Sequence, residues 1–435
     1  MAYLAFIPIF MLAMHRSQPV TLHKIDFAVF AMISLVFAWM SIGGLMAMSL
    51  PQPVPFTQQV KTVVWYMATF LSYVAVRFLP MTLKDMRFTF AAFVLLLLLS
   101  VPVVYLQQMG LMGQFYFSEE LDFAKAYRFR DVFDIIRSRN TGFFGNPHES
   151  GAAQLALCLA LFAIAREVRT RALLMVFYFV LLMSLGAIFL TGSRSSFILF
   201  PLTILTYLVV FEIGWGTIVR KVKARPSAVL RVAGLMMFAA AIILVVMKSE
   251  LRALFEKSMF MASGLSFIAM EDRVSTQVDS LSYLLLTDPI RSLFGWGMGT
   301  GGLGAITGIQ LLPVNTVDLY IVGLVSNMGL LGAGAFMLLF AYLTLSANKI
   351  YRNISLLEAG VAAPGMRIIS LFTVLALIGG FLSTFMAGQM NLKNYTVITF
   401  LCLGMVANHY ARLLLRVRSV RAAGEPAVAG RADKR

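Results

Sequence analysis

Charged and polar residues that could do chemistry gather at four places in this chain, each beside the end of an apolar run. The first place holds Arg139, His148 and Glu149 around an Asn-Pro break. The second is the short turn 191–196, in which Arg194 stands among Gly, Ser and Thr. Arginine can form paired hydrogen bonds with phosphate, and a nearby carboxylate can take a proton from a hydroxyl. These two places therefore favour chemistry on a phosphate-bearing substrate.

The other two places come later in the chain. Arg273 ends a Glu-Asp-Arg triplet, and a glycine-rich run follows at 295–302. No strand is predicted before that run, which argues against a nucleotide-binding loop, so we expect a mobile loop beside a substrate cavity. Asp318 and Tyr320 stand at the start of a long apolar run, where a carboxylate is costly unless it is solvated or paired.

Each of these residues also has a purely structural interpretation. Glu149 could stabilise the start of a helix through the helix dipole, and Arg194 could reach lipid phosphates with its long side chain. Arg273 could pair with the acids before it, which contributes little at a surface. Asp318 could pair with an arginine and hold helices together. The 4 histidines and 2 cysteines form no metal-ligand pattern, so the sequence predicts neither a metal nor another cofactor.

The amino-acid composition of the chain indicates the class of protein in which these residues are placed. Of the 435 residues, 60% are apolar and 13% are charged, and the mean hydropathy is +0.83. A typical soluble domain carries about 25% charged residues, so a soluble enzyme, a disordered scaffold and a secreted disulfide framework are excluded. The net charge of +16 lies largely in short loops between apolar runs, where it orients a membrane protein and does not indicate nucleic-acid binding.

Apolar runs long enough to cross a bilayer core of about 30 Å recur along the whole chain. We predict an all-α polytopic membrane protein with about eleven or twelve transmembrane helices. The short run at 2–14 has neither a charged start nor a cleavage site, so we expect the second half of a helix and no signal peptide. The other spans are expected near 26–49, 60–79, 88–109, 150–165, 172–191, 196–213, 231–247, 317–346, 368–388 and 391–411.

Positive charge in the short loops predicts which side of the membrane each segment faces. Loops rich in arginine and lysine, such as 166–171 and 220–225, are expected in the cytoplasm, and all four chemical places then fall on the outer side. One outer segment, 274–286, places Val274, Val278, Leu281 and Leu285 on one face, which predicts an amphipathic helix on the membrane. The predicted divisions are N-terminal helices 1–109, an outer loop 110–149, central helices 150–247, a large outer loop 248–316, C-terminal helices 317–415 and a disordered basic cytoplasmic tail 416–435.

The order of the motifs resembles that of one superfamily over about residues 135–345. The motifs are Thr-Gly-Phe-Phe-Gly-Asn-Pro-His ending at His148, Leu-Thr-Gly-Ser-Arg-Ser around Arg194, Asp272-Arg273, Gly295-Trp296-Gly297 and Asp318-Leu319-Tyr320. They are similar to those of the O-antigen ligases and Wzy-type polysaccharide polymerases of bacterial inner membranes. The resemblance implies a GT-C-like fold with two large periplasmic loops.

The same resemblance implies an activity and its partners. Such enzymes are metal-independent glycosyltransferases that take a glycan from undecaprenyl diphosphate on the periplasmic face. It implies that Arg139, Arg194 and Arg273 bind the diphosphate, and we expect Glu149 or Asp318 to accept the proton of the attacking hydroxyl. His148 and Tyr320 are further candidates for substrate contacts. The expected partners are the lipid-linked glycan, membrane lipids, a chain-length regulator and a flippase.

Two alternatives to a polymerase stay open. Ligases, which join the glycan to lipid A core, resemble each other in having a histidine in the large outer loop, but segment 248–316 contains none. Asp318-Leu319-Tyr320 is instead similar to the Asp-Asn-Tyr pattern of exopolysaccharide polymerases, from which Leu319 departs. A transporter or lipid flippase would need a pathway open to both sides. The candidate residues lie on one side, which favours an enzyme.

The predicted topology can be tested by labelling. Cysteine introduced by Ser266→Cys should react with a membrane-impermeant maleimide in cells whose inner membrane is intact, because the charge rule assigns segment 248–316 to the outer side. Labelling that requires permeabilisation of the inner membrane would reverse the orientation.

Overall fold

Helices form the framework of the part of the chain that the computed structural model describes. The described residues are 22–50, 54–113, 140–144, 147–168, 170–213, 267–301, 320–357, 365–386 and 393–422. The helices are α2 (Lys24–Met48), α3 (Phe56–Phe78), α4 (Leu83–Gln108), α7 (Pro147–Ala165), α8 (Arg171–Leu190), α9 (Arg194–Thr206) with the π-helical turn η2 (Tyr207–Ile213), α13 (Phe267–Leu286), α14 (Pro289–Phe294), α16 (Tyr320–Leu357), α17 (Gly365–Met386) and α18 (Lys393–Ala422). The prediction of an all-α protein is confirmed over these ranges.

Eight described helical segments are long and apolar enough to cross a membrane. They are α2, α4, α7, α8, α9 with η2, α16, α17 and α18, and each covers a predicted apolar run. The predicted run 60–79 lies in α3, which is not among the eight because it is more polar. The runs 2–14 and 231–247 lie outside the described residues. A multi-pass membrane protein is therefore confirmed, while the total of eleven or twelve spans stays a prediction.

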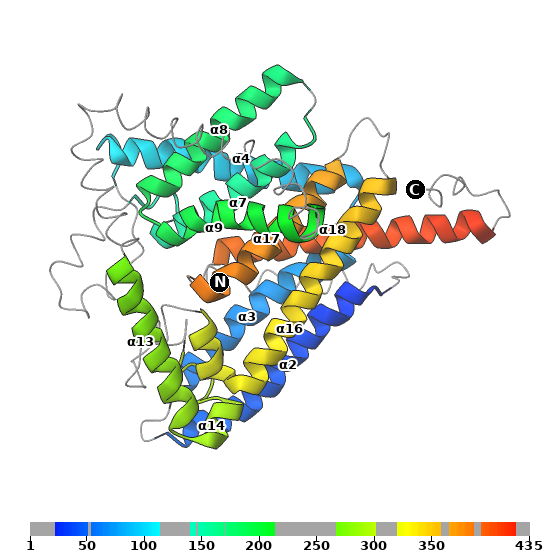
Figure 1. Cartoon of the computed structure of the whole chain (residues 1–435). Coiled ribbons are helices and arrows are strands. Elements are labelled where there is room, and N and C mark those ends of the chain that lie inside the picture. Colours follow the sequence, from blue (N-terminus) through cyan, green and yellow to red (C-terminus); the bar gives the residue numbers. More distant parts are fainter. Residues whose placement is uncertain are drawn as a thin grey trace, which may run out of the picture.

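Burial distinguishes the central helices from those that face lipid. Of the 18 residues in the most apolar stretch of each helix, 78% are buried in α7 and in α17, whereas 22% are buried in α8. Large apolar side chains cover the outside of α8, where Met175, Phe179 and Leu182 are exposed. An apolar surface of this kind is suited to contact with the hydrocarbon chains of lipids. Figure 1 shows α8 at the edge of the bundle and α17 in its interior.

The helices run back and forth, so their ends form two sets (Figure 1). One set carries the arginines of the predicted cytoplasmic loops. There Arg166 pairs with Glu212, and Arg367 pairs with Glu167 at 3.1 Å. The other set contains the starts of α7 and α9 and, packed on α2, α13 and α16, the short helix α14. The structure thus brings charged connections to one end and the candidate site residues that it describes to the other.

A buried ion pair joins α2 to α3 near the arginine-rich end. Arg77 Nε donates to Asp26 Oδ1 at 2.7 Å, and Arg77 Nη2 donates to Asp26 Oδ2 at 2.9 Å. Tyr73 Oη donates to the same Oδ1 at 2.5 Å, and Asp26 and Arg77 are only 0% and 2% exposed. Burial lowers the pKa of His23, so the neutral ring can accept from Ile25 N and cap α2. The pair therefore fixes the start of α2 on α3.

Breaking this pair from one side should be costly. We expect Arg77→Met to lower stability by about 3–5 kcal/mol, because Asp26 would stay buried without its cation. The measurement is the midpoint of thermal unfolding of the purified protein in detergent. The double variant Asp26→Asn with Arg77→Met should recover much of the loss, because no charge is then left unpaired. A single variant as stable as the wild-type protein would contradict this role.

Candidate functional site

The glycine-rich run forms a buried turn, which corrects the expectation of a mobile loop for residues 295–301. Trp296, Met298 and Thr300 are 5%, 0% and 2% exposed. Gly297 has φ +124°, and a Cβ there would lie 2.7 Å from backbone atoms of Ala47 in α2. The glycines therefore serve close packing of backbone against α2. This is a physical reason for glycine that the spacing of the run alone did not reveal.

Asn327 of α16 holds this turn through its side-chain amide. Its Oδ1 accepts from Gly299 N at 3.1 Å and from Gly301 N at 3.2 Å, while its Nδ2 donates to Gly301 O at 3.1 Å. From the other side, Gln58 Nε2 of α3 donates to Gly299 O at 2.5 Å. Three polar backbone groups that would otherwise be buried without partners are thus satisfied by one asparagine.

Helix α16 is broken at Gly329, directly after this contact. The residue has φ +66° and ψ −174°, so the helix stops and resumes in a new direction. Trp39 Nε1 of α2 donates to Met328 O at 2.5 Å and to Phe294 O at 3.2 Å. A neighbouring side chain thus satisfies carbonyls at the break, as a membrane interior requires. The segment 320–328 before the break is enclosed by its neighbours.

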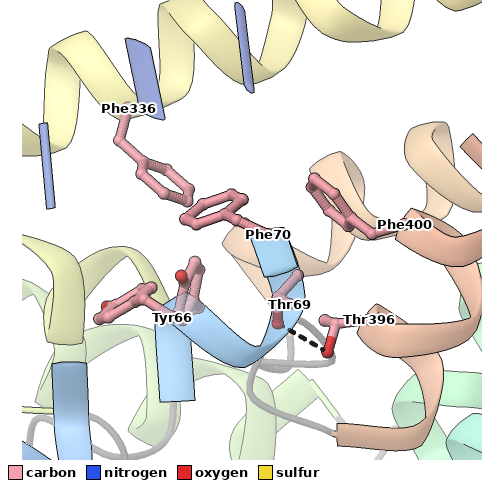
Figure 2. Close-up of a pocket in the computed structure, with 7 residues that line it drawn as sticks. Tyr66, Thr69, Phe70, Phe336, Thr396 and Phe400 are labelled. Atoms are coloured by element: carbon pink, nitrogen blue, oxygen red, sulfur yellow. Dashed lines mark hydrogen bonds between the residues drawn. The ribbon is translucent and has the colours of Figure 1, made fainter. Parts of the chain in front are cut away.

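Tyr320 begins this enclosed segment and lines a small cavity between α3, α16 and α18 (Figure 2). Tyr66 of α3 lines the same cavity, and the rings of Tyr66 and Tyr320 both pack edge-on against Phe336. The other walls of the cavity are the rings of Phe70, Phe336 and Phe400. The cavity has room for about one water molecule. A cavity of that size is too small for a sugar ring. Tyr320 is therefore part of the packed interior of the bundle.

A second polar group lies where α4 and α8 end and α7 and α9 begin. Asn140 Nδ2 donates to Leu190 O at 3.2 Å and to Gln108 Oε1 at 3.0 Å. Gln107 Oε1 accepts from Gly142 N at 2.9 Å. These bonds fix the chain before α7 against α4 and the end of α8.

The N-termini of α7 and α9 adjoin in this second group. A Cβ on Gly151 would lie 2.3 Å from the Cβ of Ser193, so only glycine permits this approach. Glu149 lies in the first turn of α7 and is half-buried, and Arg194 is the first residue of α9. Two helix N-termini together favour an anion nearby. The structure thus brings Glu149 and Arg194 to neighbouring helix starts, with exposed His148 beside them.

Other predicted site residues are placed in part or not at all. Arg139 and Asp318 lie outside the described residues, as do the side chains of Arg194 and Arg273. Arg273 belongs to α13, which packs on α14 and α16, whereas α9 packs on α7, α8 and α17. Thus Tyr320 and the helix bearing Arg273 lie with the glycine turn, and Glu149 and Arg194 lie with the second group.

The predicted amphipathic segment 274–286 is confirmed as a helix, since it lies in α13. Of its predicted apolar face, Leu281 and Leu285 pack against the core, but Val278 is 53% exposed. The fully enclosed positions are Gln277, Ser280 and Leu284. The buried face is therefore rotated from the predicted one and contains two polar residues.

The sequence analysis did not identify the residues that hold the glycine turn and the break in α16, namely Trp39, Gln58 and Asn327. The polar residue within an apolar run was an available signal for Asn327, because such residues are costly in a membrane unless they are bonded. The described residues contain no group of three or more His, Cys, Asp or Glu that could hold a metal ion.

Comparison with known proteins gives no further assignment. No protein-family model matches the chain, and no curated protein is similar to it. The likeness to membrane glycosyltransferases thus depends on the order of the motifs.

Two glycines of α16 provide a matched test of the break. We expect Gly329→Ala to destabilise the protein, because a positive φ alone costs a non-glycine residue about 1–2 kcal/mol and the new Cβ would lie 2.3 Å from Leu293 O. Gly334→Ala should be neutral or stabilising, because its Cβ would meet nothing within 4 Å and alanine favours a helix. Thermal unfolding of both purified variants checks this, and equal midpoints would contradict the break.

Proposed function

We propose that this protein is a polysaccharide polymerase of the bacterial inner membrane. It would transfer a glycan from undecaprenyl diphosphate to a sugar hydroxyl of a second lipid-linked glycan on the periplasmic face. The observation that supports this most is the approach of Gly151 to Ser193, which joins the helix starts that carry Glu149 and Arg194. A cation and a carboxylate at adjoining helix N-termini suit a diphosphate and an attacking hydroxyl.

The proposed reaction is a single displacement with inversion. The acceptor oxygen attacks the anomeric carbon, the bond from that carbon to the diphosphate oxygen breaks, and undecaprenyl diphosphate leaves with the electron pair. Arg139, Arg194 and Arg273 would stabilise the negative charge that grows on the leaving group, where preorganised donors act most strongly. No redox cofactor is needed for this electron balance.

A carboxylate would take the proton from the attacking hydroxyl. Glu149 is the first candidate because it shares its end of the bundle with Arg194, and Asp318 is the second. The helix dipole favours the charged form of a carboxylate at this position, which makes it a weaker base but keeps it ready to accept a proton at neutral pH. Glu149 could also orient the acceptor hydroxyl through a hydrogen bond.

Polymerisation by the purified protein tests the proposal. In nanodiscs with lipid-linked repeat units, Arg194→Lys should lose most polymer formation, because lysine keeps the charge but lacks the planar fork of arginine. Glu149→Gln should slow turnover by about 10²–10⁴-fold if Glu149 is the base. Gel analysis of the glycan products measures both effects.

Arg166→Lys is the matched control, because Arg166 lies at the opposite end of the bundle in a half-exposed pair with Glu212. It should polymerise like the wild-type protein. Near wild-type polymer from Arg194→Lys would remove Arg194 from the site. If the glycan were transferred to added lipid A core and not to a second repeat unit, the protein would be a ligase.

A further inference from the structure

Helix α14 and the glycine turn after it are fastened along the last turns of α2. Gly297 lies against the backbone of α2, since a Cβ on Gly297 would lie 2.7 Å from Ala47 N and Cα. A Cβ on Gly43 would lie 3.0 Å from Met298 N, so the turn also passes over Gly43. α14 itself packs on α2 and α16 (Figure 1). This part of the chain therefore runs beside a helix that is long and apolar enough to cross a membrane.

The contacts with α2 show how far this chain reaches along that helix. Arg291 Nη2 donates to Ser49 O at 3.0 Å, directly after the end of α2. Trp39 Nε1 donates to Phe294 O at 3.2 Å, and Trp39 stands nine residues before the end of α2, or about 13.5 Å. Gly43 stands five residues before that end, or about 7.5 Å. The chain thus passes from the end of α2 to positions further into this helix.

After Met298 the chain returns to the end of α2. A Cβ on Gly299 would lie 3.1 Å from the side chain of Val54, and Gln58 Nε2 donates to Gly299 O at 2.5 Å. Val54 stands between α2 and α3 in the sequence, and Gln58 stands in the first turn of α3. The turn therefore leaves at the same end of the bundle at which α14 begins.

The charges of α2 indicate where the bilayer lies along it. Lys24 and Asp26 stand at its start, and the sequence contains no charged residue between Asp26 and Lys61. A hydrocarbon core of about 30 Å takes about 20 helical residues, so a core that begins after Asp26 extends to about residue 46. Trp39 and Gly43 stand within that range. The positions of α2 that contact the end of α14 and the glycine turn thus fall within the hydrocarbon core.

Backbone groups of this segment are bonded as a hydrocarbon environment requires. Asp288 Oδ1 accepts from Ile290 N at 2.9 Å and from Arg291 N at 3.2 Å, so a side chain satisfies N–H groups in the first turn of α14. Trp296 N donates to Ser326 O at 2.7 Å, and α3 and α16 bond with the glycine turn. In water such groups can bond with solvent, whereas in lipid each of them needs a partner in the protein.

One face of α14 is apolar and is not covered by the described part of the chain. Ile290 and Leu293, three residues apart in the helix, are 61% and 42% exposed. A Cβ on Gly329 would lie 2.3 Å from Leu293 O, and the two residues that follow Gly329 in α16, Leu330 and Leu331, are 46% and 50% exposed. The apolar face of α14 thus lies close to exposed leucines of a membrane-length helix.

We propose that α14 and the glycine turn form a re-entrant segment, which enters the bilayer beside α2 and leaves it on the same side. The face of Ile290 and Leu293 then contacts lipid acyl chains, which match it because it is uncharged and continues to the leucines of α16. Asp288 and Arg291 pair at 3.3 Å beside the end of α2, where headgroups and water can solvate them. The predicted outer loop 248–316 would then contain a segment inside the membrane. This inference does not depend on the proposed polymerase activity.

Collisions of a nitroxide spin label with oxygen, which concentrates in lipid, and with a water-soluble nickel chelate test the proposal. A label on Ile290→Cys in full-length protein in nanodiscs should give an oxygen-to-chelate collision ratio close to that of the lipid control, Leu182→Cys on the exposed face of α8. Lys84→Cys, at an exposed position at the start of α4, is the water control. The native Cys158 and Cys402 are buried, and wild-type protein treated with the same reagent measures their background.

Leu293→Cys gives a second reading on the same helix. Both substitutions replace exposed side chains, so both variants should fold like the wild-type protein. Ratios close to that of Lys84→Cys would place α14 in water and overturn the proposal. Few collisions with either reagent would show that another protein surface, such as a second copy of this chain, covers the face, and would also overturn it.

Discussion

A bilayer offers no water to backbone polar groups, and this constraint decides how the end of the bundle around the glycine turn is built. The chain breaks α16 at Gly329 and turns sharply at residues 295–301, which frees several N–H and C=O groups. Asn327, Gln58 and Trp39 accept or donate to those groups from three different helices. The irregular backbone is thus tolerated because α2, α3 and α16 supply partners, and in return the turn fastens these three helices to one another.

The two polar groups at this end have different characters. Around the glycine turn, polar side chains form hydrogen bonds with backbone groups. The cavity beside Tyr320 and Tyr66 has room for about one water molecule. At the meeting of α7 and α9, half-buried Glu149 and exposed His148 remain close to the surface. The second group therefore places ionisable side chains nearer to the surface than the first group does.

Long apolar runs were predictable from the sequence, because about 20 apolar residues in a row have few other solutions. The break in α16 could not be predicted from the sequence. Gly329 and Gly334 stand in the same apolar run, and only the nearness of Leu293 O and Trp39 makes one a break and the other an ordinary helical residue. Likewise, Arg194 and Glu149 were each recognisable as unusual, but their shared location follows from the contact between Gly151 and Ser193, which no local pattern encodes.

We propose that the protein forms glycosidic bonds at the expense of a lipid diphosphate. The most direct measurement is the release of undecaprenyl diphosphate by purified protein in nanodiscs, counted against the glycosidic bonds formed from lipid-linked repeat units. We expect the release of one undecaprenyl diphosphate for each new bond, at a rate that does not change when EDTA is added. Lengthening of the glycan without release of undecaprenyl diphosphate, or turnover that EDTA abolishes and a divalent ion restores, would contradict it.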